Sequence, residues 1–141
     1  VLGVHVAGAD VTSGRLDLAA YRVAAEQVSR DFGAALVAIT LRESTSASDN
    51  GWSGVLWDAG ARAFHHSRRY DVRLVDRIGG GDSFAAGLIY ALVTGRATSA
   101  ALEFAVAASA LKQTIPGDFN RVSAAEVDRL AGGDASGRVQ R

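Results

Sequence analysis

The chain has 141 residues, of which 48% are hydrophobic and 21% charged, so it is long enough for one globular domain with a buried core. Fifteen basic residues balance fifteen acidic ones, and there is no cysteine. These features argue against nucleic acid and membrane partners and exclude disulfides and thiolate metal sites. We therefore expect a cytoplasmic domain that binds a small molecule and contains no set of metal ligands. Assembly into a homo-oligomer is compatible with these features.

The first part of the chain alternates between strand-like and helix-like patterns. The segment Val1 to Ala7 is compatible with a short strand or with the end of a missing element. Because no initiator methionine precedes it, we expect the chain to be a fragment. Apolar residues at helical spacing predict an amphipathic helix over residues 16–32, which Gly33 ends. The wholly apolar run 34–41 predicts a strand covered on both faces, as in a parallel sheet.

The middle of the chain predicts strands joined by short turns. The polar segment RESTSASDNG, residues 42–51, is typical of a loop. WSGVLWD, ARAFHHS and YDVRLVD then predict three strands. Together with the preceding helix, these elements indicate an α/β fold.

The last third predicts three helices. The first follows a glycine run and ends near Gly95, and the second, over residues 99–112, is apolar almost all round and therefore buried. A turn at Pro116 and Gly117 follows, and Ser123 with Glu126 predicts a capping box for a final helix through about residue 131.

The glycine run lies in VDRIGGGDSFAAGLIYAL, residues 75–92, between a strand pattern and a helix pattern. It is neither a Walker A loop, because the lysine is absent, nor a dinucleotide fingerprint, because Phe84 replaces the third glycine. One hypothesis is a plain turn with Asp82 as helix N-cap. The other is an anion hole of backbone N–H groups, with Asp82 as the general base that activates a hydroxyl for attack on a γ-phosphoryl group.

The segment DRIGGGDSFAAG, residues 76–87, resembles the DxxGxGDxFxxG signature of the ribokinase-like (PfkB) carbohydrate kinases. The segments AITLRESTSASDNGWS and ALEFAVAASALKQTIPGDFN extend the resemblance to the C-terminal part of the bacterial 2-dehydro-3-deoxygluconate (KDG) kinases. The resemblance implies a three-layer ribokinase-like fold with a mostly parallel central sheet and flanking helices. It also implies that residues 1–141 are the C-terminal nucleotide-binding and catalytic portion, without the N-terminal sugar-binding and lid portion.

The resemblance assigns roles to residues of the signature and of two loops. It implies that Asp82 is the base and also touches the sugar, that the amides of Gly79, Gly80 and Gly81 hold the transferring phosphate, and that Asp118 reaches the sugar. Asp76 either organises metal or phosphate through water or caps a strand end, and Asp118 has the alternative of a turn cap. The loop after the apolar strand implies nucleotide contacts from Thr40, Arg42, Ser44, Thr45 and Ser46, although the glycine usual there is missing.

The activity implied is ATP-dependent phosphorylation of a sugar's terminal hydroxyl, with Mg²⁺ supplied as the ATP complex. The substrate expected first is 2-dehydro-3-deoxy-D-gluconate. Two alternatives stay open: a kinase for another sugar, such as fructose or ribose, and a non-catalytic nucleotide-binding module. Because the lid is missing, we expect the chain alone to be inactive as a kinase.

Overall fold

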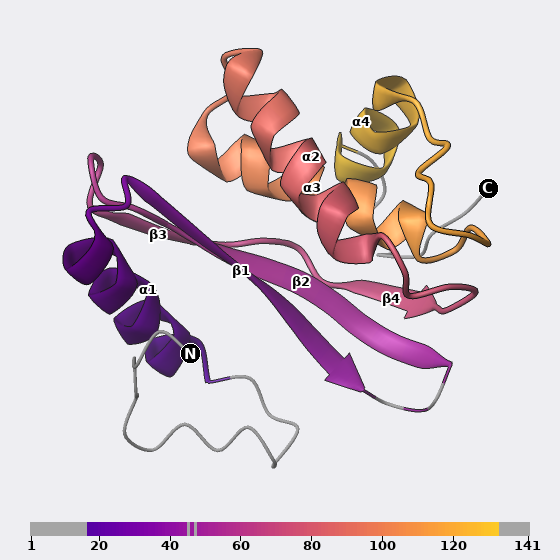
Figure 1. The fold of residues 1–141 in the computed structure, drawn as a ribbon, viewed down its shortest axis with the longest axis horizontal. Coiled ribbons are helices and arrows are strands. Elements are labelled where there is room, and N and C mark those ends of the chain that lie inside the picture. Colours follow the sequence, from indigo (N-terminus) through magenta and orange to yellow (C-terminus); the bar gives the residue numbers. More distant parts are fainter. Residues whose placement is uncertain (1–16, 45, 47, 133–141) are drawn as a thin grey trace.

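The computed structural model describes residues 17–44, 46 and 48–132. Within these residues the chain forms one helix, four strands and three further helices, in that order (Figure 1). Their bounds are α1 Leu18–Phe32, β1 Leu36–Ser44, β2 Asp49–Asp58, β3 Ala63–His66, β4 Tyr70–Arg73, α2 Gly80–Val93, α3 Thr98–Lys112 and α4 Ala124–Gly132. The strand expected at Val1 to Ala7 lies outside the described residues.

The four described strands form one sheet in which every pairing is antiparallel. β2 is central: it pairs with the whole of β1 on one edge and with β3 and β4 on its other edge. The prediction of a mostly parallel sheet is therefore wrong for the described part of the chain. The apolar run of β1 is typical of a parallel strand, but the chain returns through a short hairpin, and a short connection allows only antiparallel pairing.

The connection between β1 and β2 is shorter than the sequence predicts. Residues 42–44 continue β1 and residues 49–51 begin β2, so much of the expected loop is strand. Ser46 holds the turn between them, since its hydroxyl accepts hydrogen bonds from the N–H of Asp49 at 2.9 Å and of Ser48 at 3.2 Å. Polar composition predicts a loop, but pairing between β1 and β2 keeps these polar residues extended.

Helices cover both faces of the sheet and produce three layers (Figure 1). α1 packs on β1 and β2 from one face, α3 packs on β2 from the other, and α2 and α4 pack against α3. Gly54 marks the tightest approach of β2 to the helices, because a Cβ there would lie 3.0 Å from a methyl of Val106 and 3.3 Å from the ring of Phe84. The predicted three-layer α/β architecture is confirmed.

The helix ends follow local sequence features. Gly33, in the left-handed region at φ +67°, ends α1 as predicted. The capping box of α4 is also confirmed: the N–H of Ser123 donates to Oε2 of Glu126 at 2.8 Å, and the N–H of Glu126 donates to Oγ of Ser123 at 3.3 Å. Among the helices of the described residues, none has the length and apolarity needed to cross a membrane.

Candidate functional site

A left-handed glycine begins the helix that carries the signature. Gly79 has φ +76° and is the N-cap of α2, and no side chain caps this end. The hypothesis that Asp82 is the N-cap is therefore wrong. The helix starts three residues earlier than that hypothesis requires, and Asp82 lies within its first turn, where a carboxylate faces the positive end of the helix dipole.

The three consecutive glycines have different surroundings. A Cβ on Gly79 would lie 2.2 Å from the backbone oxygen of Asp118, so this position needs glycine both for its positive φ and for the close approach. Gly80 is buried, and its carbonyl accepts a 2.7 Å hydrogen bond from the hydroxyl of Ser109. Gly81 faces open space, with no atom within 4 Å of a Cβ placed there. Only Gly81 leaves room for a ligand beside the backbone.

The first turn of α2 offers backbone donors to this open space. Helix geometry leaves the first N–H groups without an acceptor inside the helix. The N–H of Gly80 donates to the carbonyl of Arg77 at 3.3 Å and that of Ser83 to the carbonyl of Gly79 at 2.9 Å. The N–H groups of Gly81 and Asp82 lie between them and belong to the first turn, which is the geometry of an anion site at a helix N-terminus.

A second turn, residues 113–120, packs against residues 76–82, the glycine turn that leads into α2. The carboxylate of Asp76 accepts hydrogen bonds from the N–H of Ile78 and from the N–H of Gly117, both at 3.0 Å, and so joins the two turns. These two hydrogen bonds, first from Ile78 and then from Gly117, lower the pKa of Asp76, and the charge of Lys112 adds to the effect. Asp76 therefore serves as a cap for both turns, which favours the capping hypothesis for this residue.

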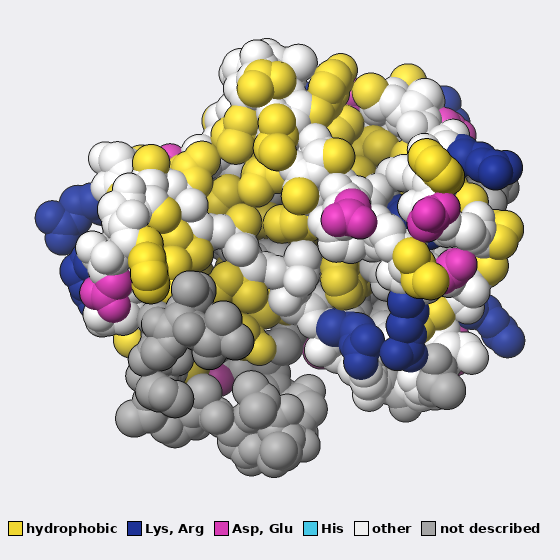
Figure 2. Space-filling model, viewed as in Figure 1, with side chains coloured by type: hydrophobic (Ala, Val, Ile, Leu, Met, Phe, Trp, Pro, Cys, Tyr) yellow, Lys and Arg dark blue, Asp and Glu magenta, His cyan; other side chains and the backbone are white. Residues whose placement is uncertain are grey.

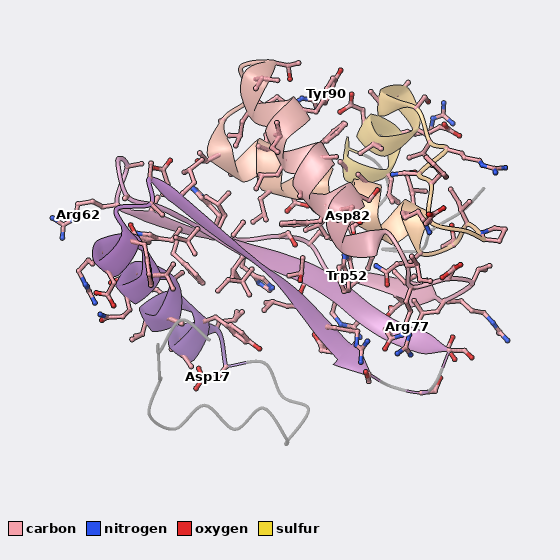
Figure 3. The ribbon with its side chains drawn as sticks, viewed as in Figure 1. Asp17, Trp52, Arg62, Arg77, Asp82 and Tyr90 are labelled. Carbon is pink, nitrogen blue, oxygen red and sulfur yellow. The ribbon has the colours of Figure 1, made fainter. Side chains whose placement is uncertain are left out.

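Asp82 and Asp118 line the same groove. Both side chains belong to exposed residues, and the groove has a volume of about 390 Å³, within the range of small-molecule sites. Figure 3 shows Asp82 on the first turn of α2, at the end of the helix that faces the glycine turn, and Tyr90 near the opposite end. The rest of the lining is mostly apolar and comes from α2, α3, α4 and the second turn, including Phe104, Ala108 and Val127. The structure thus brings together two carboxylates that are 36 residues apart in the sequence, at positions 82 and 118.

Asn120 is a groove residue that the sequence analysis did not identify. Its side-chain amide donates to the hydroxyl of Ser83 and, at 3.4 Å, to the carbonyl of Ala108. It therefore links the second turn to both α2 and α3. Its position two residues after Asp118 was the only sequence indication, because an asparagine in a polar turn is common for reasons unrelated to a site.

The predicted nucleotide loop has a different environment. Thr40, Arg42 and Ser44 alternate on one face of β1 and are exposed, and none of them lines the groove. Thr40 pairs with Gly54, whose Cβ position points at α2 and α3, so these three residues lie on the sheet face that carries α2. Ser46 holds the hairpin turn, and Thr45 lies outside the described residues.

Comparison with known proteins identifies the fold. The model of the pfkB family carbohydrate kinases matches residues 20–123. The crystal structure of 2-dehydro-3-deoxygluconokinase from Thermotoga maritima superposes with a TM-score of 0.83 and 46% sequence identity, covering 94% of this chain. A PfkB family carbohydrate kinase from Listeria grayi superposes with a TM-score of 0.71 and 27% identity over 87% of this chain. The predicted ribokinase-like fold is confirmed.

These relatives are longer than this chain. The chain covers 38% of the Thermotoga structure and 37% of the Listeria structure. A 2-dehydro-3-deoxygalactonokinase from Haloferax volcanii is 40% identical over 67 residues, which are 47% of this chain and 21% of that protein. The similarity therefore concerns one part of each relative.

Proposed function

Because the chain belongs to the pfkB family of carbohydrate kinases, we propose that residues 1–141 form the C-terminal nucleotide-binding and catalytic portion of an ATP-dependent sugar kinase. One observation carries this proposal: an exposed carboxylate, Asp82, lies in the first turn of α2 beside the backbone donors of Gly81 and at the edge of the groove. A carboxylate next to an anion site repels phosphate unless it has a proton to accept, and a kinase needs such a base.

The chemistry follows from this placement. The γ-phosphate of ATP would lie at the N–H groups of the glycine turn, where the helix dipole and the donors stabilise its charge. Asp82 would take the proton of a sugar hydroxyl as the hydroxyl oxygen attacks the γ-phosphorus, and the bond from that phosphorus to ADP breaks. The products are ADP and the sugar phosphate, with the proton on Asp82.

The open side of the glycine turn fits a phosphate group. A Cβ on Gly81 would meet no atom within 4 Å, so the backbone at this residue leaves room for a ligand on its outer side. Within the described residues no cluster of three or more acidic or histidine side chains could hold a metal ion. Mg²⁺ binds to kinases through the phosphates of the substrate with one or two carboxylates, so it needs no such cluster and would be supplied as the ATP complex.

The proposed substrate is 2-dehydro-3-deoxy-D-gluconate, phosphorylated on its terminal hydroxyl to the 6-phosphate. The name of the Thermotoga relative, at 46% identity, supports a sugar acid of this type. The Haloferax relative acts on the galactonate counterpart by its name, and that sugar acid is the second candidate. Fructose or ribose follows, because most of the chain that would select the sugar lies in the part of the relatives that this chain does not match.

The absence of cysteine is compatible with a cytoplasmic enzyme.

The surface around β1 supports the proposal that more of a kinase fold packs here. Among the described strands β1 pairs only with β2, although its residues 36–39 are apolar and only half-buried. An exposed apolar edge strand is normally paired or covered. Large hydrophobic side chains are also exposed on two helices, namely Val23 and Phe32 on α1 and Ile89, Tyr90 and Val93 on α2. Figure 2 shows hydrophobic side chains over α2 and further patches toward the sheet and α1.

Replacing the base tests the catalytic proposal. In the full-length protein, Asp82→Asn keeps the size of the side chain but removes its ability to accept a proton, so we expect kcat to fall by roughly 10²- to 10⁴-fold. The melting temperature should change little, because an acid in the first turn contributes only about 0.3–1 kcal/mol through the helix dipole. If the variant keeps more than about a tenth of the wild-type kcat, the assignment of Asp82 as base is wrong.

A coupled ADP-release assay on the 141-residue chain by itself tests the proposed division of the fold. We expect little or no turnover, because Asp82 is exposed to water in this structure and the chain covers only 38% of the Thermotoga kinase. Addition of the remaining part of the kinase as a separate polypeptide should restore activity by covering the edge of β1. Ordinary turnover of the sugar acid by the 141 residues alone would contradict the proposal.

A further inference from the structure

Lys112 is the one charged side chain with 0% exposure in the described part of the chain. It is also the only lysine among fifteen basic residues, so at every other basic position the chain uses arginine. Burying an ammonium group is costly unless its charge is compensated. Its position at the end of α3, near the negative end of the helix dipole, compensates only part of that cost.

The side chain of Lys112 lies beneath the glycine turn. Its Cε is 3.2 Å from the position that a Cβ on Gly79 would occupy. Its Nζ donates to the carbonyl of Ile115 at 3.3 Å, at the start of the second turn. One buried side chain therefore lies against both turns, with its Cε beside Gly79 and its Nζ bonded to Ile115.

The charges around this position are unequal. Three carboxylates, those of Asp76, Asp82 and Asp118, lie on the two turns, and the proposed ligand of the same turns is a polyphosphate. Arg77 also lies on the glycine turn, but its side chain is exposed and water screens its charge (Figure 3). Lys112 is separated from water, so its charge acts on its surroundings at a lower effective dielectric constant.

We propose that Lys112 is a positioning residue for the phosphate site. Its buried stem packs beside Gly79, its ammonium bonds the second turn at Ile115, and its positive charge lets a phosphate bind among three carboxylates. The inference rests on the proposed function, because it assumes that the start of α2 holds a phosphate group of a nucleotide. Lys112 itself does not touch the groove, since it does not belong to the lining.

A lysine suits this position better than the residues that could replace it. An ammonium group is a compact point charge on a flexible stem, whereas the planar guanidinium of arginine requires more space and donors in a fixed arrangement. Methionine has a similar length and would fill the same space without charge. No carboxylate bonds the Lys112 ammonium within the described residues, and methionine avoids the cost of burying its charge. The charge and the packing of Lys112 can therefore be separated by experiment.

The experiment compares two ligands that differ in their phosphates. The dissociation constants of ADP with Mg²⁺ and of adenosine are measured by calorimetry on the full-length protein, its Lys112→Met and Lys112→Gln variants, and Arg129→Met as a control. Gln keeps a donor for the carbonyl of Ile115, and Arg129 is an exposed cation of α4 outside the groove lining, so its loss changes the net charge equally. Melting temperatures are recorded for all four proteins.

We expect both Lys112 variants to bind ADP about tenfold more weakly, which is the effect of one charge roughly 10 Å from the phosphate at an effective dielectric constant near 20. Adenosine binding and the Arg129→Met protein should be unchanged, and the melting temperatures of the Lys112 variants should stay near that of the wild type. Equal weakening of ADP and adenosine, unchanged binding of ADP, or failure of both variants to fold would each overturn the proposal.

The wild-type protein separates this inference from the proposed function. If the wild type binds ADP no more tightly than adenosine, the start of α2 is not a phosphate site and the proposed function itself is wrong. If the wild type prefers ADP and the Lys112 variants keep the whole preference, only the role of Lys112 is wrong.

Discussion

Two regions were expected to contact the nucleotide, the glycine turn before α2 and the hairpin end of β1, and the structure holds them in different ways. Contacts that are distant in sequence fix the glycine turn: Asp76 bonds the N–H of Gly117, 41 residues away, and Gly79 packs on the backbone of Asp118. The hairpin end is held by its own ladder with β2 and by a local hydrogen bond of Ser46. A site that must place a base against a phosphate needs long-range contacts, whereas a strand that only borders the ligand does not.

The largest expected difference lies within the glycine turn itself. Gly79→Ala should lower the free energy of unfolding by about 1–3 kcal/mol. The alanine would have to adopt a left-handed backbone conformation, and its Cβ would press against the carbonyl oxygen of Asp118. Gly81→Ala is the matched control and should raise it by about 0.5–1 kcal/mol, because Gly81 has open space and a helical position. Urea unfolding of both variants measures this, and similar effects at the two positions would contradict the assignment of close contact to Gly79.

The second turn should affect the sugar rather than the nucleotide. We expect Asp118→Ala to raise the KM for the sugar acid about tenfold in the full-length protein, because a groove carboxylate can accept hydroxyl hydrogen bonds from a sugar. The KM for ATP should change much less, since a carboxylate does not attract a triphosphate. Steady-state kinetics with each substrate varied in turn measure both constants, and equal changes would return Asp118 to a purely structural role in the turn.

A weaker effect is expected at the hairpin. Arg42 is exposed on the face of β1 that carries α2, and a single exposed charge contributes about 0.2–1 kcal/mol. Arg42→Ala should therefore raise the KM for ATP only by about twofold to fivefold and leave the melting temperature unchanged. No change in the KM for ATP would remove the hairpin from the nucleotide site and leave the glycine turn as its only proposed part.

The smallest effect concerns the pH dependence of the contact between the two turns. Hydrogen bonds from Ile78 and Gly117 lower the pKa of Asp76 below its ordinary value of 3.8, so the folded state favours the charged carboxylate. The stabilisation is fully present above that pH and is lost as the pH falls through the lowered pKa. Unfolding measured between pH 2 and pH 6 should show that Asp76→Asn loses less stability than the wild type over the lowest part of this range. An identical acid dependence of the two proteins would show that Asp76 does not join the turns.

The sequence by itself determined the features that depend on a few neighbouring residues. Gly33 ends α1 and Ser123 with Glu126 caps α4, because a cap is a contact within one helix turn. The signature around Asp82 likewise indicated the family that the comparison then identified, and the apolar helix at residues 98–112 was recognisable from composition alone.

Only the tertiary structure decided the features that depend on residues far apart in the chain. The apolar run of β1 is compatible with a parallel or an antiparallel neighbour, and the pairing with β2 decided between them. Three consecutive glycines in a sequence do not reveal that Gly79 packs against the backbone of Asp118 or that the carbonyl of Gly80 accepts a hydrogen bond from Ser109. They also do not reveal that Gly81 faces open space. The sequence gives no sign that Lys112 is buried, because a lysine at the end of a helix is ordinarily solvated and only contacts with Gly79 and Ile115 enclose this one.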